Sequence, residues 1–264
     1  MHHSHIDRFA QGSSPLHRLD ARAKLLAVLA YTVVLISFDR YSVAALAPMA
    51  LAPLAWLWLA DVPMRFALRR VLLLGPFIIT LALASPIYDR AARLGAFGPW
   101  QFELAGGWFT AANIAAKFAL GVLAMTALIC TTPFGTLLEA MDHLKVPRLL
   151  VMQLGLLYRY LFELIDQAMR VRRARDFRGG HLAPAGRRLR TAGSMVGSML
   201  AGSIQKAQRV ELAMASRGYT GQPRGLRRLR LGWADALLMA GMAGYLAICR
   251  WALPAMLHGR PEGA

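Results

Sequence analysis

The chain has 264 residues, of which 56% are hydrophobic and only 17% are charged, and 31 lysines and arginines against 14 acidic residues give it a net charge of +17. This composition excludes a disordered or low-complexity protein, which would lack the apolar surface needed to offset its conformational entropy. The charged fraction is also below the roughly 25% of an ordinary soluble domain. Because apolar runs long enough to cross a bilayer recur along the chain, we interpret it as an integral membrane protein.

Five segments have the length and apolarity of a membrane helix, which needs about 20 residues. The first segment, 21–38, follows a polar stretch without the apolar core of a signal peptide, so we expect it to insert uncleaved. The others are expected at 42–60, 66–86, 107–132 and 233–250. Pro48, Pro53 and Pro76 lie within these segments and are tolerated where neighbouring groups satisfy the carbonyls that they free.

Lys117 is a charged residue inside the fourth predicted span. An ionisable side chain at membrane depth is a functional candidate. The alternative is that Lys117 snorkels to the outer interface or faces a neighbouring helix, and we favour that alternative.

The distribution of charge predicts the orientation. Residues 133–232 hold 18 of the 31 lysines and arginines, and the N-terminal stretch is also basic. Since cytoplasmic segments carry an excess of Lys and Arg, we place both regions in the cytoplasm and the C-terminus outside. The predicted domains are an N-terminal membrane domain with four spans (1–132), a cytoplasmic segment (133–232), and a last span with an external tail (233–264).

The segment 133–232 is too long for a connection without its own structure. We expect a short helix at 134–144, a long helix from Pro147 to Phe177 and a second long helix at about 190–217. Gly193, Gly197 and Ala201 form a small-residue stripe on the second of these long helices, which would let another helix approach closely. The segment thus predicts two long amphipathic helices that pack across each other or lie along the membrane.

Each long helix ends in a basic motif, and these two ends are the candidate coupling sites. The motifs are Ala174-Arg175-Asp176 and Ala215-Ser216-Arg217-Gly218. A helix C-terminus alone can explain a cation and a nearby glycine, which complement the helix dipole and supply a left-handed cap. Two such ends on one segment also suit docking to acidic surfaces on partner subunits.

The sequence shows no catalytic constellation. Cys130 and Cys249 are far apart in apolar runs and support neither a disulfide nor a zinc site. There is no P-loop for nucleotide and no HExxH or GxSxG motif. His2, His3 and His5 are candidate ligands for nickel, cobalt or zinc, but a polar terminus offers no shaped site, so we predict no metal centre.

Taken together, these features resemble the T component of energy-coupling factor (ECF) transporters, and within that family the cobalt-transport branch, CbiQ. The resemblance rests on His5-Ile6-Asp7-Arg8 followed by the stretch from Ser14 to Leu25, on Thr131-Thr132-Pro133 leading to Leu144-Lys145-Val146-Pro147, on Arg159-Tyr160 with Glu163, and on the two Ala-Arg motifs. The chain departs from the family pattern at three positions. Ala21 stands where Pro is usual, Asp176 replaces Gly in the first motif, and Ser216 separates Ala from Arg in the second.

The resemblance implies an all-α membrane protein with about five transmembrane helices and two long crossed coupling helices. It implies a non-catalytic subunit of an ATP-driven importer in the bacterial inner membrane, with cobalt as the expected cargo and nickel or a vitamin as the alternative. The implied partners are two CbiO-like ATPases that bind the ATP, a CbiM-like subunit that captures the ion, in some cases a small CbiN-like subunit, and membrane lipid. The chain itself would hold no cofactor and bind no nucleic acid.

Two functions from other classes compete with this interpretation. The first is a membrane-bound enzyme acting on lipid or isoprenoid substrates, which would need polar or metal-binding residues gathered at the membrane face. The second is a membrane anchor that recruits a regulator through its basic helices.

Overall fold

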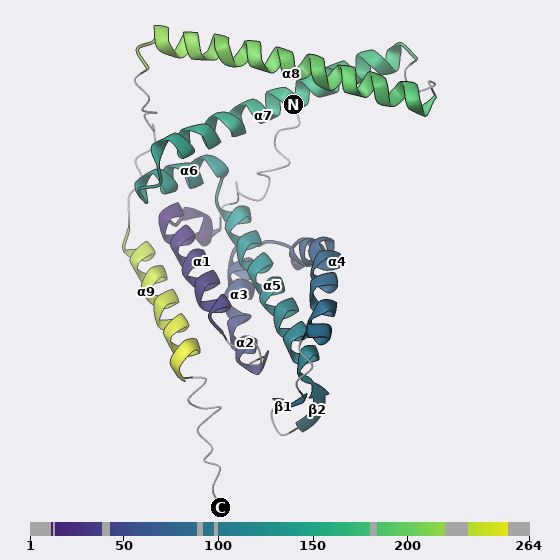
Figure 1. The fold of residues 1–264 in the computed structure, drawn as a ribbon. Coiled ribbons are helices and arrows are strands. Elements are labelled where there is room, and N and C mark those ends of the chain that lie inside the picture. Colours follow the sequence, from purple (N-terminus) through teal and green to yellow (C-terminus); the bar gives the residue numbers. More distant parts are fainter. Residues whose placement is uncertain are drawn as a thin grey trace, which may run out of the picture. The chain divides into compact units, whose positions relative to one another are not determined.

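A computed structural model of the chain describes residues 12, 14–38, 43–88, 92–97, 100–179, 184–219 and 232–252 (Figure 1). The chain forms two compact units. The first unit comprises Met1–Ala140 and Leu229–Ala264, and the second comprises Met141–Arg228. Most described residues are helical, as predicted for an all-α membrane protein.

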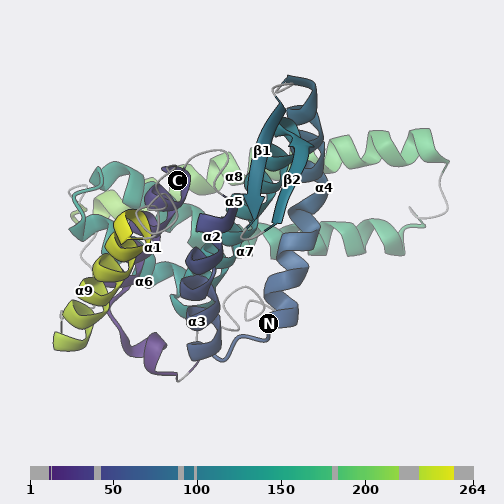
Figure 2. The same ribbon diagram turned by 90° about the horizontal axis from the view of Figure 1, so that it is seen from below.

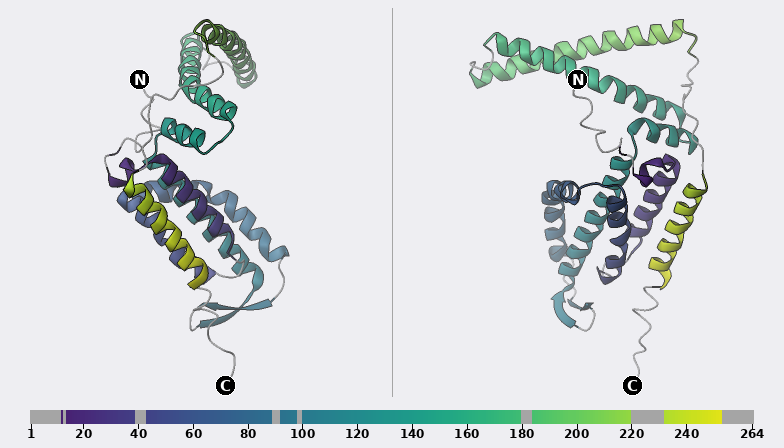
Figure 3. Two further views of the ribbon diagram at one scale, coloured as in Figure 1. Left: turned by 90° about the vertical axis from the view of Figure 1, so that its left-hand side faces the viewer. Right: turned by 180° about the vertical axis from the view of Figure 1, so that it is seen from behind.

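The first unit is a helical bundle built around one central helix, α5. A 3-10 turn, η2 (Pro15–Arg18), precedes the bundle. The helices of the bundle are α1 (Ala21–Ile36), α2 (Val43–Met49), α3 (Leu51–Leu59), α4 (Met64–Tyr88), α5 (Gly106–Thr131) and α9 (Trp233–Ala247). Helix α5 packs against α1, α2, α3 and α4, and α1 also packs against α9. Figure 3 shows α1, α5 and α9 running beside one another. Helix α6 (Phe134–His143) follows α5 where the chain passes into the second unit.

Two described helices are both long and apolar enough to cross a bilayer, at Met64–Ser85 (22 residues) and Gly107–Thr131 (25 residues). Leu46–Leu59 is a shorter apolar helical stretch. Helix α1 has 16 residues, and the 15 residues of α9 continue directly into five residues of π-helix, η3 (Ile248–Ala252). The all-α membrane architecture is confirmed, and the count of five spans stays a prediction.

A two-stranded antiparallel hairpin connects α4 to α5 (Figure 2). Strand β1 (Ala92–Phe97) pairs with β2 (Trp100–Ala105), with Ala92 opposite Ala105. This hairpin was not predicted from the sequence, although the run Trp100-Gln101-Phe102-Glu103-Leu104 alternates apolar and polar residues as a strand does. Because α4 and α5 pack against each other, they bring the two ends of the connection together, which favours pairing of its strands.

Two tyrosines satisfy backbone carbonyls beside the prolines of the second predicted span. Pro53 has no N–H, so the carbonyl four residues before it, that of Met49, loses its helical donor. The buried Tyr31 hydroxyl donates to this carbonyl at 2.9 Å. The Tyr245 hydroxyl donates to the carbonyl of Pro48 in the same way. Neighbouring helices therefore satisfy this backbone, as a proline-containing membrane helix requires.

Helices α1 and α5 each donate a lysine to the C-terminal end of the other. Lys24, near the start of α1, donates from Nζ to the carbonyl of Thr131, the last residue of α5, at 3.1 Å. Lys117 of α5 donates to the carbonyl of Phe38 at 2.5 Å, and that of Ile36 lies at 3.4 Å. A cation is favourable there because the last carbonyls of a helix lack internal donors and carry partial negative charge. Lys117 thus faces a neighbouring helix.

The second unit contains two long helices that cross, α7 (Arg148–Phe177, 30 residues) and α8 (Ala185–Ser216, 32 residues) (Figure 1). Pro147 and Pro184 are the N-cap residues of the two helices, a position where the missing backbone N–H of proline costs no helical hydrogen bond. Helix α8 therefore begins at Ala185, earlier than the predicted start near residue 190. An ion pair between Lys206 of α8 and Glu163 of α7 links the two helices.

We predict that Tyr31→Phe lowers the free energy of unfolding by about 1–3 kcal/mol, because it leaves the buried Met49 carbonyl without a donor. Thermal unfolding of the purified protein in detergent measures the loss. The matched background is Pro53→Ala, which restores an N–H four residues after Met49. In that background Tyr31→Phe should cost clearly less, and an equal cost in both backgrounds would contradict the assigned role of Tyr31.

Candidate functional site

The end of α8 forms a complete glycine cap. Gly218 has a φ of +71°, in the left-handed region that favours glycine. Its N–H donates to the carbonyl of Ala215 at 3.0 Å, and the N–H of Tyr219 donates to that of Met214 at 3.1 Å. This pair of bonds is the Schellman arrangement, which satisfies carbonyls that a helix end leaves open. Arg217 is the C-cap residue and lies directly before the glycine.

The end of α7 has the same backbone geometry, but its C-cap residue is Arg178 rather than Arg175. Gly179 has a φ of +71°, and its N–H donates to the carbonyl of Asp176 at 3.1 Å. Arg178 has φ and ψ of −88° and 19°, against −90° and 10° for Arg217. The pair Arg178-Gly179 is therefore the structural counterpart of Arg217-Gly218, three residues beyond the arginine of the predicted motif.

Arg175 is held by its own neighbour. Its Nε and Nη2 atoms donate to one carboxylate oxygen of Asp176 at 3.1 and 2.8 Å, and its side chain is only 25% exposed. The Nε atom of Arg172 lies 4.0 Å from the other oxygen of Asp176. Asp176 thus forms an ion pair with Arg175, which makes that guanidinium less available to another protein.

Unlike Arg175, the arginines at the two cap positions are free of such an acidic neighbour in the sequence. Arg178 and Arg217 are both exposed, and neither forms an ion pair with any residue that the structure describes. The pattern Ala-Arg-Gly points to Arg175 and not to Arg178, so Arg178 was not identified as a candidate from the sequence. The dipeptide Arg-Gly, which occurs at both helix ends, was the available signal.

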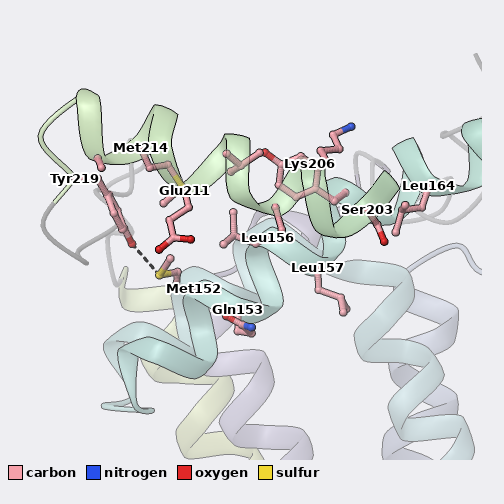
Figure 4. Close-up of a pocket in the computed structure, with 14 residues that line it drawn as sticks. Met152, Gln153, Leu156, Leu157, Leu164, Ser203, Lys206, Glu211, Met214 and Tyr219 are labelled. Atoms are coloured by element: carbon pink, nitrogen blue, oxygen red, sulfur yellow. Dashed lines mark hydrogen bonds between the residues drawn. The ribbon is translucent and has the colours of Figure 1, made fainter. Parts of the chain in front are cut away.

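A groove of about 730 Å³ runs between α7 and α8 (Figure 4). Apolar side chains from both helices line much of it, including Leu156 of α7 and Met214 of α8. The hydroxyl of Tyr219 lies 2.8 Å from the sulfur of Met152 and donates to it. Tyr219 directly follows the glycine cap, so this contact ties the end of α8 to the beginning of α7.

The predicted small-residue stripe of α8 lies on an exposed surface. Gly193, Gly197 and Ala201 are exposed, and no described atom outside α8 lies within 4 Å of where a Cβ would stand on either glycine. By contrast, Gly202 is close to α7, since the Nε2 atom of Gln167 would lie 3.5 Å from such a Cβ. Helix packing on the stripe therefore stays a prediction.

The described residues contain no group of three or more His, Cys, Asp or Glu side chains that could hold a metal ion. Cys130 and Cys249 are buried and unpaired with each other. The candidate ligands His2, His3 and His5 lie outside the described residues.

Comparison with known proteins gives one family match and several similar relatives. Residues 12–226 match the family CbiQ, described as cobalt transport protein. The chain is 26% identical to the energy-coupling factor transporter transmembrane protein EcfT of Leuconostoc gelidum subsp. gasicomitatum, over 96% of this chain and 98% of that protein. It is 27% identical to the EcfT protein of Streptococcus thermophilus, over 86% and 89%. It is 32% identical to the cobalt transport protein CbiQ of Rhodobacter capsulatus, over 62% and 64%.

We predict opposite effects for the same substitution at two glycines of α8. Gly218→Ala should strain the left-handed cap by about 1–2 kcal/mol and speed hydrogen exchange of the Tyr219 amide, which bonds across the cap. Gly193→Ala, in open space within the helix, should stabilise it by about 0.5–1 kcal/mol. Hydrogen exchange and thermal unfolding measure both variants. Equal effects at the two positions would show that the cap does not need a glycine.

Proposed function

The chain belongs to the CbiQ family of cobalt transport proteins, and we propose that it is the transmembrane T component of an ATP-driven ECF importer in the bacterial inner membrane. In this role the chain is not an enzyme. It passes motion from two cytoplasmic CbiO-like ATPases to a separate CbiM-like membrane subunit that captures the ion, with or without a small CbiN-like subunit.

The observation that supports this role most strongly is the matching pair of helix ends. Arg178 and Arg217 occupy the same cap position on two long helices, next to glycines with the same φ. Each arginine is exposed, so each helix end can meet an acidic surface on one ATPase. Two equivalent contacts suit two copies of a similar ATPase, because one mode of docking serves both.

The second unit also has the mechanical properties that a coupler needs. Helices of 30 and 32 residues carry displacement along their length, since every turn is braced by backbone hydrogen bonds. The ion pair of Lys206 with Glu163 and the bond of Tyr219 to Met152 connect one helix to the other. These two contacts join the helices at separate points, and each helix carries movement along its own length.

The sequence and the names of the relatives support the assignment of ATP and of the cargo. The sequence has no P-loop, so ATP is bound by the partner subunits and not by this chain. Cobalt is the cargo favoured by the family description and by the name of the Rhodobacter capsulatus relative. Nickel or a vitamin is the alternative cargo, because several similar relatives are named energy-coupling factor transporter transmembrane protein, without cobalt in the name.

The proposed topology places the N-terminus and the coupling segment, 133–232, in the cytoplasm. There the arginine ends of α7 and α8 can reach the ATPases. The domains 1–132 and 233–264 then supply the membrane-embedded part, and contacts with the capture subunit form within or beside it.

We predict that Arg217→Glu lowers cobalt uptake by about tenfold or more, the factor that corresponds to 1.4 kcal/mol of lost docking free energy. Reversing the charge should repel an acidic partner surface and release an ATPase during co-purification. The matched control is Arg209→Glu, the same change at an exposed position of α8 away from its end, which should keep normal uptake and ATPase binding.

The equivalent test on α7 compares Arg178→Glu with Arg175→Glu. The cap geometry predicts the larger loss of uptake for Arg178, because Asp176 already engages Arg175. A larger loss for Arg175 would show that the Ala-Arg motif, and not the cap position, meets the ATPase. Normal uptake and co-purification in the Arg217 and Arg178 variants alike would contradict the proposed function itself.

A further inference from the structure

A buried polar cluster lies at the end of the first unit where the chain leaves for the second unit and where it returns. The last residue of α5, Thr131, precedes the passage into the second unit, and Gly232 precedes α9 on the way back. Residues 14–24 contact both places, and we name them the N-terminal brace. Any force that the covalent chain carries between the two units enters the bundle at these two points.

The brace binds the end of α5 through two side chains. The Nζ atom of Lys24 donates to the carbonyl of Thr131 at 3.1 Å, and it also lies 3.4 Å from the carbonyl of His17 within the brace. The Nε2 atom of His17 lies 3.2 Å from the carbonyl of Cys130 and forms a hydrogen bond with it. Two successive carbonyls of the last turn of α5 are therefore attached to the brace.

The brace binds the start of α9 through one carboxylate. Asp235, only 4% exposed, accepts from the backbone N–H of Asp20 at 2.7 Å through Oδ1. Its Oδ2 accepts from the N–H of Gly232 at 2.8 Å. Asp235 thus caps its own helix and fixes that helix to the brace at the same time. The side chain of Asp20 in turn accepts from the N–H of Arg22 at 2.9 Å and caps α1.

Charge compensation makes the cluster a single unit. Lys24 is only 2% exposed, and the carboxylates of Asp235 and Asp20 both act electrostatically on its ammonium group. A buried lysine without such partners would be costly, so the three charged groups depend on one another. The last residue of α5 and the start of α9, which are far apart in the sequence, are therefore joined through one buried network.

On the basis of the proposed function, we propose that Lys24 and Asp235 are positioning residues for transport. They hold the end of α5 and the start of α9 together, so that motion of the coupling segment moves the bundle as one body. Without them the two chain passages separate locally, and ATP hydrolysis moves the coupling helices without moving the capture subunit. The bundle itself persists, because its apolar cluster around Tyr31 and Leu128 contains no residue of the brace.

The test compares Lys24→Met and Asp235→Asn with a matched control, Lys117→Met, in the purified transport complex reconstituted into liposomes. Lys117 makes the same kind of bond, a lysine to the C-terminal carbonyls of a neighbouring helix, at the other end of α1. We expect Lys24→Met and Asp235→Asn to lower the number of ions transported per ATP hydrolysed about tenfold, equivalent to 1.4 kcal/mol, while ATP hydrolysis and subunit association persist. Lys117→Met should leave this ratio unchanged.

A second readout tests the brace without relying on transport. Hydrogen exchange at the amide of Gly232 should speed up in Asp235→Asn, because the new amide nitrogen cannot accept the bond that Oδ2 accepts, while the amide of Asp20 stays bonded to the remaining oxygen. The same amides should keep their protection in Lys117→Met. This measurement does not depend on ATPase binding. Failure of the proposed function is therefore distinguishable from failure of the brace.

Three results would overturn the proposal. The first is an unchanged transport ratio in Lys24→Met and Asp235→Asn, and the second is an equal loss in Lys117→Met, which would indicate general destabilisation. The third is loss of complex assembly in both brace variants, which would assign Lys24 and Asp235 to folding alone. Asp235→Asn is the milder variant, because its amide oxygen can still accept from Asp20.

Discussion

Backbone carbonyls that no helical N–H can reach are the constraint on which the membrane unit depends. Inside a bilayer there is no water to satisfy them, so other parts of the protein must do so. The end of α5 supplies such a carbonyl at Thr131, the chain just beyond α1 supplies one at Phe38, and a proline frees another at Met49. Two lysines and a tyrosine on neighbouring helices meet them. The polar side chains of the bundle are therefore placed where the backbone is incomplete.

These bonds also determine how the helices align. Apolar packing alone gives little preference for one axial position of a membrane helix, since lipid tails are as apolar as the neighbouring side chains. Lys24 of α1 and Lys117 of α5 allow only one axial position of the two helices at which both lysines reach their carbonyls. A hydrogen bond that involves a charged group contributes about 1.5–3 kcal/mol. The alignment of α1 on α5 thus rests on a few polar contacts within a large apolar surface.

Local patterns predicted the helices well and the contacts between them poorly. The ends of α7 near Pro147 and Phe177 followed from proline and glycine signals that act on adjacent residues. Lys24 and Asp235 gave no local signal of their role, because their partners lie 107 and 215 positions away. Glu163 shows the same limit, since the sequence offers Arg159 one turn earlier while the structure pairs it with Lys206 on α8. The cap position of Arg178 could be identified only once the last residue of α7 was known.

The second unit combines stiff helices with a crossing that few contacts hold. The stripe of Gly193 and Gly197, predicted to bring two helices close, is open, and a groove separates parts of α7 and α8. The ion pair that spans the crossing is partly exposed, and such pairs contribute little stability. The rigidity needed for coupling therefore resides within each helix. A change in the crossing angle costs little, so in the proposed complex a force on the arginine ends would alter that angle before it bent either helix.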